Sequence, residues 1–112
     1  MRYTTSLNRN FQFRRMYRSA KSKADKYLVL YYRKNRGTEN HLGITVSKKV
    51  GTAVVRNRIR RLIKENYRIN EEKVIKGYDF VIVARSKAAE ADFYQIRSSL
   101  LSLLSSCDLE KK

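Results

Sequence analysis

The segment from residue 53 to residue 68, with the sequence AVVRNRIRRLIKENYR, constrains the fold more than any other part of the chain. Its apolar residues recur three and four positions apart, which is the spacing of one face of an α-helix. Thr52 supplies a hydroxyl that suits the N-cap of a helix over residues 53–69. At about 100° per residue, one side of this helix holds Val55, Ile59, Leu62 and Ile63. The chain therefore has to bury this side against another layer of structure.

The opposite side of the same helix is strongly cationic. Residues 53–68 include five Arg and one Lys but a single acid, Glu65. Guanidinium groups form paired hydrogen bonds with phosphate, and side chains four residues apart repeat about every 6 Å along a helix. We therefore predict that this side binds a nucleic-acid backbone. A solvated charged face is one alternative, and a calmodulin-type or membrane-surface helix is another, although the apolar side lacks Trp and Phe. The cationic side is formed by Arg56, Asn57, Arg60, Arg61, Lys64 and Arg68.

Composition favours a polyanionic partner. The 112 residues include 26 Lys and Arg against 10 Asp and Glu, a formal net charge of +16 that is self-repelling unless an anion is bound. The length fits one domain. The first residues, MRYTTSLNRNF, contain no apolar segment, and the apolar runs are too short to cross a bilayer, so we expect a cytoplasmic protein without a membrane partner. The single Cys107 excludes an internal disulfide, and its spacing in the last segment favours a buried thiol.

Five further segments carry helix or strand patterns. Apolar spacing predicts helices over residues 8–19 and 88–107, and β-branched and aromatic content predicts strands over 26–33, 41–48 and 77–86. The short polar loop between the first two strands predicts a hairpin. This order of helices and strands predicts a single-domain α+β sandwich, of the split-βαβ kind.

The first helix and the first strand are both rich in aromatic residues. Phe13, Met16 and Tyr17 share one face of the helix, which Asn8 or Asn10 is expected to cap. In the strand, alternation predicts one face with Leu28, Leu30 and Tyr32, and another with Tyr27, Val29 and Tyr31.

Packing of this helix across the sheet would create a groove that suits single-stranded nucleic acid, because such sites combine stacked rings with cations. The rings of Phe13, Tyr17 and Tyr31 would line it. Its fringe would be formed by Arg14, Arg18, Lys48 and Lys49. The alternative for each ring is a place in the core, since a chain without Trp has to fill its core with Phe and Tyr.

No catalytic or metal-binding set of residues is evident in the sequence. His41 is the only histidine, and without a partner carboxylate placed to orient it, it is predicted to lie near a turn or in the groove rather than to act as a base. The acids are scattered, with no spacing suited to two metal ions. If the protein serves a reaction, another molecule has to supply the catalytic groups.

The segment from Thr45 to Arg68, TVSKKVGTAVVRNRIRRLIKENYR, resembles the signature of the bacterial ribonuclease P protein subunit, including its Arg-Asn-Arg motif at residues 56–58. The segments FQFRRMYRSAKS, YLVLYY and YDFVIVARSK resemble other elements of that family, so the similarity covers nearly the whole chain. The resemblance implies an α-β-β-β-α-β-α order, ribosomal protein S5 domain 2-like, with a left-handed crossover around the Arg-rich helix. One short strand is expected from the resemblance alone.

The resemblance also implies a function. Members of this family assist a catalytic RNA that removes the 5′ leader of precursor tRNA, with magnesium bound chiefly by the RNA, and the protein itself neither cleaves nor needs to oligomerise. It implies that the catalytic RNA contacts Arg56, Asn57, Arg58, Arg60, Arg61, Lys64 and Arg68. It implies that the leader contacts Phe13, Tyr17, Tyr31, Lys48 and Lys49. A general RNA-binding protein and a protein-only nuclease are the alternatives.

Overall fold

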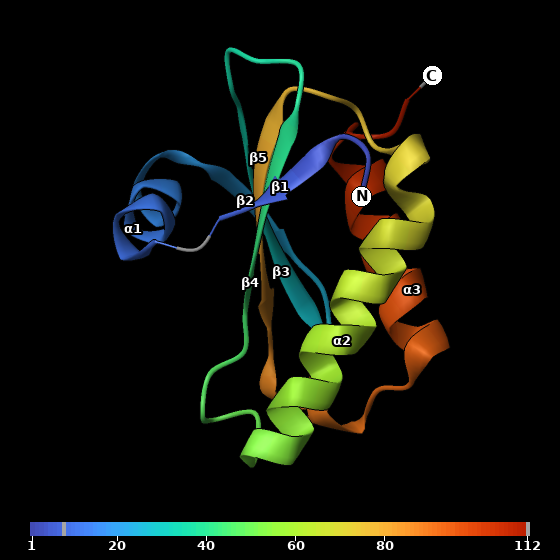
Figure 1. The fold of residues 1–112 in the computed structure, drawn as a ribbon. Helices are drawn as coiled ribbons and strands as arrows, with labels where there is room; N and C mark the ends of the chain where they lie inside the picture. The colour runs from blue at the N-terminus through green and yellow to red at the C-terminus, as the bar shows by residue number, and fades with distance from the viewer. Residues whose placement is uncertain (8, 112) are drawn as a thin grey trace.

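The computed structural model describes residues 1–7 and 9–111. A five-stranded sheet separates two helical layers, with α2 and α3 on one face and α1 on the other (Figure 1). The elements in chain order are β1 (Thr4–Ser6), α1 (Asn10–Ser19), β2 (Lys21–Ala24), β3 (Leu28–Lys34), β4 (Asn40–Thr45), α2 (Ala53–Asn70), the 3-10 helix η1 (Glu71–Lys73), β5 (Tyr78–Ala84), the 3-10 helix η2 (Ser86–Glu90) and α3 (Phe93–Ser106). The expected α+β sandwich is confirmed, with β1 as an additional first strand. In the described residues, no helix is long and apolar enough to span a membrane.

The strand order across the sheet is β1-β4-β5-β3-β2. The strands β4 and β5 are parallel neighbours, and α2 forms the crossover that connects them. The hairpin expected between residues 26–33 and 41–48 is wrong, because β5 lies between β3 and β4. Phe80, Val81 and Ile82 of β5 are each at most 1% exposed, and a strand buried on both faces belongs at the centre of a sheet.

The edge strands β1 and β2 are not among the strands that apolar patterning predicts. Their sequences, TTS and KSKA, are polar, and both strands are mostly exposed. A carboxylate fixes the chain near each of them. Asp25 accepts hydrogen bonds from the backbone of Tyr27 and Leu28, both at 2.9 Å, in the turn from β2 to β3. The buried Glu71 accepts bonds from the backbone of Arg2 and Tyr3, at 2.7 and 3.0 Å, just before β1.

Three helix boundaries follow from capping. Thr52 caps α2 as predicted, with its Oγ1 accepting a bond from the Val55 backbone N–H at 3.4 Å. The N-cap of α1 is Arg9, so the expected cap at Asn10 is wrong, and Asn8 lies outside the described residues. The last helix begins at Phe93 rather than at residue 88, because Asp92 and Gln95 form a reciprocal capping box there.

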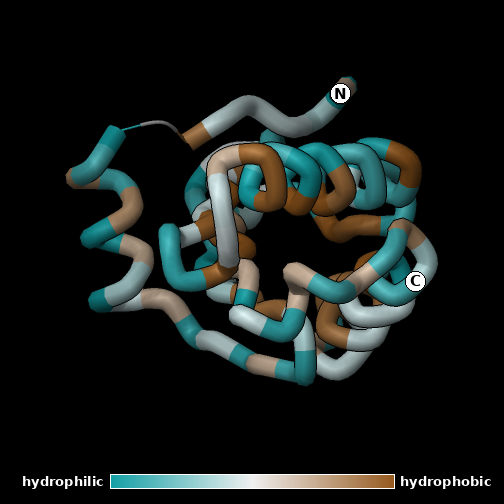
Figure 2. The backbone as a smooth tube through the Cα atoms, turned by 90° about the horizontal axis from the view of Figure 1, so that it is seen from below, coloured by the Kyte–Doolittle hydropathy of each residue, from teal (hydrophilic) through white to brown (hydrophobic). Residues whose placement is uncertain are grey.

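The core has two parts, one on each face of the sheet. The larger part packs α2 and α3 against the sheet. In Figure 2, most of the hydrophobic stretches of the backbone lie in the sheet and these two helices. The smaller lies under α1 and contains Leu7, Met16 and Val81. Tyr27 precedes β3 and packs against the larger core, so its predicted place beside Tyr31 is wrong. Cys107 is half-buried at the end of α3 rather than fully buried.

Candidate nucleic-acid interface

The two faces of α2 are divided as the sequence predicts. Ile59 and Ile63 are fully buried, and Val55 and Leu62 pack at the margin of the core. On the other side, Arg56 and Arg60 are half-buried, whereas the remaining polar residues are exposed. The exposed set is Asn57, Arg61, Lys64 and Arg68.

Arg58 differs from the other arginines of α2 because its guanidinium is bound within the protein. Its Nη1 donates to the carbonyl oxygen of Ala91 at 3.0 Å, and its Nη2 donates to that of Ala89 at 2.7 Å. Both carbonyls belong to the η2 segment and the short connection to α3. The predicted RNA-contacting residue Arg58 therefore ties α2 to the segment that leads into α3.

Arg68 and Arg60 also have partners in the chain. Arg68 forms an ion pair with Glu65, in which its Nε lies 3.1 Å from the carboxylate. This pairing lowers the pKa of Glu65, so the acid stays ionised on the cationic face. Arg60 donates to Asn57 Oδ1 at 3.2 Å and lies 3.5 Å from the Val46 carbonyl oxygen, which draws it towards β4.

A cleft of about 540 Å³ lies between α1 and the end of β4. The hydroxyl groups of Tyr17 and Thr45 meet across it at 3.2 Å. Arg60 reaches the cleft from α2, so the cationic helix and the aromatic groove share one side chain. The residues that line this aromatic cleft are Asn10, Phe13, Arg14, Tyr17, Ile44, Thr45, Val46 and Arg60.

Packing against the sheet holds the two rings of the aromatic cleft in place. A Cβ at Gly43 would lie 2.6 Å from Cε1 of Phe13, so the ring rests on β4 where only glycine leaves room. Tyr17 packs edge-to-face on Tyr31, with ring centroids 4.9 Å apart. Phe13 and Tyr17 line the cleft as predicted, whereas Tyr31 lies beneath Tyr17 in the smaller core.

Lys48 and Lys49 lie in the exposed turn between β4 and α2 and do not line the cleft. Arg60 and Asn10 do line it, and neither was predicted for the groove. The proximity of Arg60 depends on how the crossover from β4 to β5 places α2, which no local pattern reveals.

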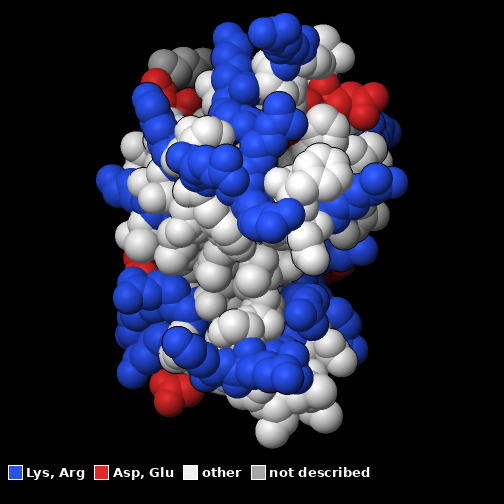
Figure 3. Space-filling model, turned by 90° about the vertical axis from the view of Figure 1, so that its left-hand side faces the viewer, with Lys and Arg blue, Asp and Glu red and all other residues white. Residues whose placement is uncertain are grey.

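The charged side chains on this side of the molecule are separated by an uncharged band. Figure 3 views the α1 side and shows a band of uncharged side chains between two groups of Lys and Arg, with few acids. A phosphate backbone favours such cationic margins, and unpaired bases favour the uncharged floor.

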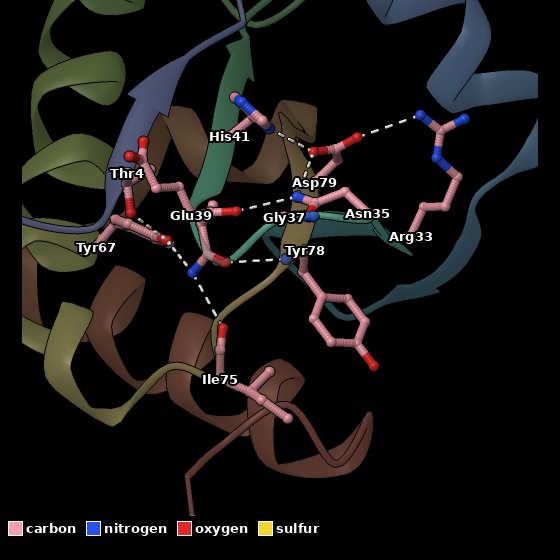
Figure 4. A network of polar contacts seen from close by, with 11 residues as sticks. Thr4, Arg33, Asn35, Gly37, Glu39, His41, Tyr67, Ile75, Tyr78 and Asp79 are labelled. Carbon is pink, nitrogen blue, oxygen red and sulfur yellow. Dashed lines mark hydrogen bonds and ion pairs between the residues drawn. The ribbon is translucent and has the colours of Figure 1, made fainter.

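His41 has a carboxylate partner after all. Its Nδ1 lies 2.7 Å from Oδ1 of Asp79, which is 38 residues away in sequence, so the expectation of no partner is wrong. Asn35 and Arg33 donate to the same carboxylate at 3.0 and 3.2 Å (Figure 4). Burial alone would raise the pKa of Asp79, but these hydrogen bonds from Asn35, His41 and Arg33 outweigh it and leave the pKa below its ordinary value. The network therefore keeps the carboxylate of Asp79, near the start of β5, in its ionised form.

In residues 1–7 and 9–111, no group of three or more His, Cys, Asp or Glu is placed to hold a metal ion. The rings and cations of the cleft suit single-stranded nucleic acid, and the cationic side of α2 suits a phosphate backbone.

Comparisons with known proteins agree over nearly the whole chain. The model of the Ribonuclease P family matches residues 1–108. A ribonuclease P protein component of Clostridium botulinum is 50% identical over 99 residues, covering 88% of this chain and 89% of the relative. One from Alkaliphilus oremlandii is 43% identical over 109 residues, covering 97% and 96%.

Two solved structures are similar as well. The RNase P protein of Staphylococcus aureus superposes with a TM-score of 0.87 at 33% identity, covering 95% of this chain and 97% of that one. The RNase P protein of Thermotoga maritima superposes with a TM-score of 0.83 at 33% identity, covering 90% and 96%. The architecture described above is therefore shared with these proteins along almost its full length.

Proposed function

Because the chain belongs to the ribonuclease P protein family, we propose that it binds the catalytic RNA of ribonuclease P through α2 and the 5′ leader of precursor tRNA in the aromatic cleft, which we call the leader cleft from here on. Its relatives are named ribonuclease P protein components, which makes the chain an accessory subunit of a ribonucleoprotein that processes tRNA. Cleavage at the mature 5′ end resides in the RNA in this proposal, with magnesium bound chiefly by that RNA.

The contact with the catalytic RNA uses the polar side of α2. Arginine and lysine side chains there bind phosphates and release condensed counterions, which makes the binding dependent on salt. Arg58 is left out of this surface, because its guanidinium is bound to Ala89 and Ala91. The proposed docking residues are Arg56, Asn57, Arg60, Arg61, Lys64 and Arg68.

The contact with the leader uses the rings of the cleft. Phe13 and Tyr17 offer stacking surfaces, and stacking is worth about 1–3 kcal/mol per base with little dependence on sequence. Tyr31 supports Tyr17 from below, and Lys48 and Lys49 lie on the turn that leads from the cleft to α2. Mature tRNA has no leader, so these contacts favour the substrate over the product.

The observation that carries the proposal is the position of Arg60, which lines the aromatic cleft while belonging to the cationic face of α2. A leader strand in the cleft and an RNA along α2 would thus meet at one guanidinium. The cations would offset the repulsion between the two RNA molecules, which lowers the magnesium concentration that the reaction needs.

Single-turnover cleavage of a 5′-labelled precursor tRNA at low magnesium tests the proposal. The reactions contain this protein alone, a bacterial ribonuclease P RNA alone, or both. We expect efficient cleavage at the mature 5′ end only with both. Cleavage by the protein alone would instead identify a protein nuclease, and an unchanged rate on adding the protein would identify a general RNA-binding protein.

A further inference from the structure

A second pocket lies at the corner of the sheet where α1 ends and β2 begins. It has a volume of about 220 Å³ and shares no lining residue with the leader cleft. The strand β2 begins at Lys21 opposite Tyr32, so Arg33 and Lys34 of β3 extend beyond it and leave a step in the sheet edge. The residues that line this edge notch are Ser19, Lys21, Tyr32, Arg33, Lys34 and Tyr78.

Two tyrosine rings form the apolar part of the edge notch, and both are half-buried. The Tyr78 ring stacks on Phe80, with centroids 5.9 Å apart and planes inclined by 15°. It points away from the polar network around Asp79 (Figure 4). Tyr32 packs against the larger core, as Tyr78 does. The core therefore holds both rings in position while part of each remains accessible.

Three cations surround these rings, and no acid lines the edge notch. Arg33 is fixed, because it donates to Ser19 Oγ at 2.9 Å and to Asp79 at 3.2 Å. Lys21 and Lys34 are exposed, and within the described part of the chain neither forms an ion pair. Two ammonium groups are therefore free to bind an anion beside the rings.

We propose that the edge notch binds an unpaired nucleotide of RNA, with the base against Tyr78 and the adjacent phosphate on Lys21 and Lys34. Stacked rings flanked by cations are the combination that single-stranded nucleic acid requires, whereas an acidic peptide would gain little from the rings. The proposal rests on the proposed function only in that the chain works on RNA. It adds a second contact at the edge of the sheet that is separate from the leader cleft.

Photo-crosslinking of the full chain to an unstructured oligoribonucleotide that carries 4-thiouridine tests the edge notch, with the crosslinked residues located by mass spectrometry. We expect adducts at the edge notch as well as at the leader cleft. Tyr78→Leu should lower the yield at the edge notch at least fivefold, about the smallest effect of losing one stacked base. Tyr78→Phe keeps the ring and should behave like the wild type.

Lys21→Gln with Lys34→Gln is a second test that leaves the rings in place. It should reduce notch adducts while leaving cleft adducts unchanged. Adducts at the leader cleft alone, or an undiminished yield in Tyr78→Leu, would overturn the notch proposal without affecting the proposed function. Adducts at the edge notch alone would support it and would refute the assignment of the leader cleft.

Discussion

Arg58 and Arg61 both belong to α2, and comparing them tests directly which side chains support the fold and which contact RNA. Arg58→Ala removes two charged donors from the carbonyls of Ala89 and Ala91. At the lower end of the range for charged hydrogen bonds, the pair would be worth roughly 3 kcal/mol. Because the guanidinium is half-exposed and water replaces part of each bond, we expect a loss of about 2 kcal/mol in the free energy of unfolding.

Urea denaturation of the protein alone measures this loss, and the midpoint of thermal unfolding should fall by about 8 °C for a domain of this size. Arg61→Ala is the matched control, because Arg61 is exposed and lies on the same helix. It should change the free energy of unfolding by less than about 0.5 kcal/mol.

For binding to the catalytic RNA we expect the reverse: Arg61→Ala should change it, and Arg58→Ala should not. Arg61→Ala should make the dependence of log affinity on log salt shallower by close to one unit, as expected for one lost phosphate contact. Arg58→Ala should leave that slope unchanged under conditions where the variant is folded. Wild-type stability combined with a shallower slope in Arg58→Ala would refute the reasoning, because Arg58 would then contact RNA.

Three further predictions concern the cleft, the docking surface and the polar network. Phe13→Ala and Tyr17→Ala should each weaken binding of precursor tRNA by about 1–3 kcal/mol in equilibrium titrations of the assembled ribonucleoprotein, and equal loss for mature tRNA would contradict the leader assignment. Arg60→Ala with Lys64→Ala should weaken assembly with the catalytic RNA and flatten its salt dependence, and an unchanged slope would place the docking surface elsewhere. Asp79 has a lower pKa in the folded than in the unfolded chain, so its stabilising effect is present above pH about 4 and disappears as the pH falls through the folded value. Wild type and Asp79→Asn should therefore converge in stability as the pH is lowered below about 4 in urea titrations, and a constant difference would argue against the ionised network.

The sequence was most informative where one periodic pattern covers a long segment. The faces of α2 follow from apolar residues every three or four positions, and Thr52 marks its start. The strand β3 follows from alternation, which places Leu28 and Leu30 in the larger core and Tyr31 in the smaller one. These patterns are local, because each element buries its own apolar side.

The features that the sequence did not predict depend on contacts between distant parts of the chain. The role of Arg58 is set by carbonyls more than 30 residues away, and the partner of His41 is 38 residues away. The edge strands β1 and β2 have polar sequences that become strands only by pairing with β4 and β3. In the same way, Arg60 reaches the leader cleft only because the crossover from β4 to β5 places α2 beside it.

The central position of β5 also affects how the chain folds during its synthesis. β5 is the last strand to be made, yet it joins β4 to β3 in the middle of the sheet. Until residues 78–84 emerge, the nascent chain holds only two separate halves, β1 with β4 and β2 with β3, each with an open edge where β5 belongs. Unpaired apolar edges favour aggregation. A polypeptide that stalls before β5 is therefore the form that most needs a chaperone, and a premature stop codon there would leave an insoluble fragment.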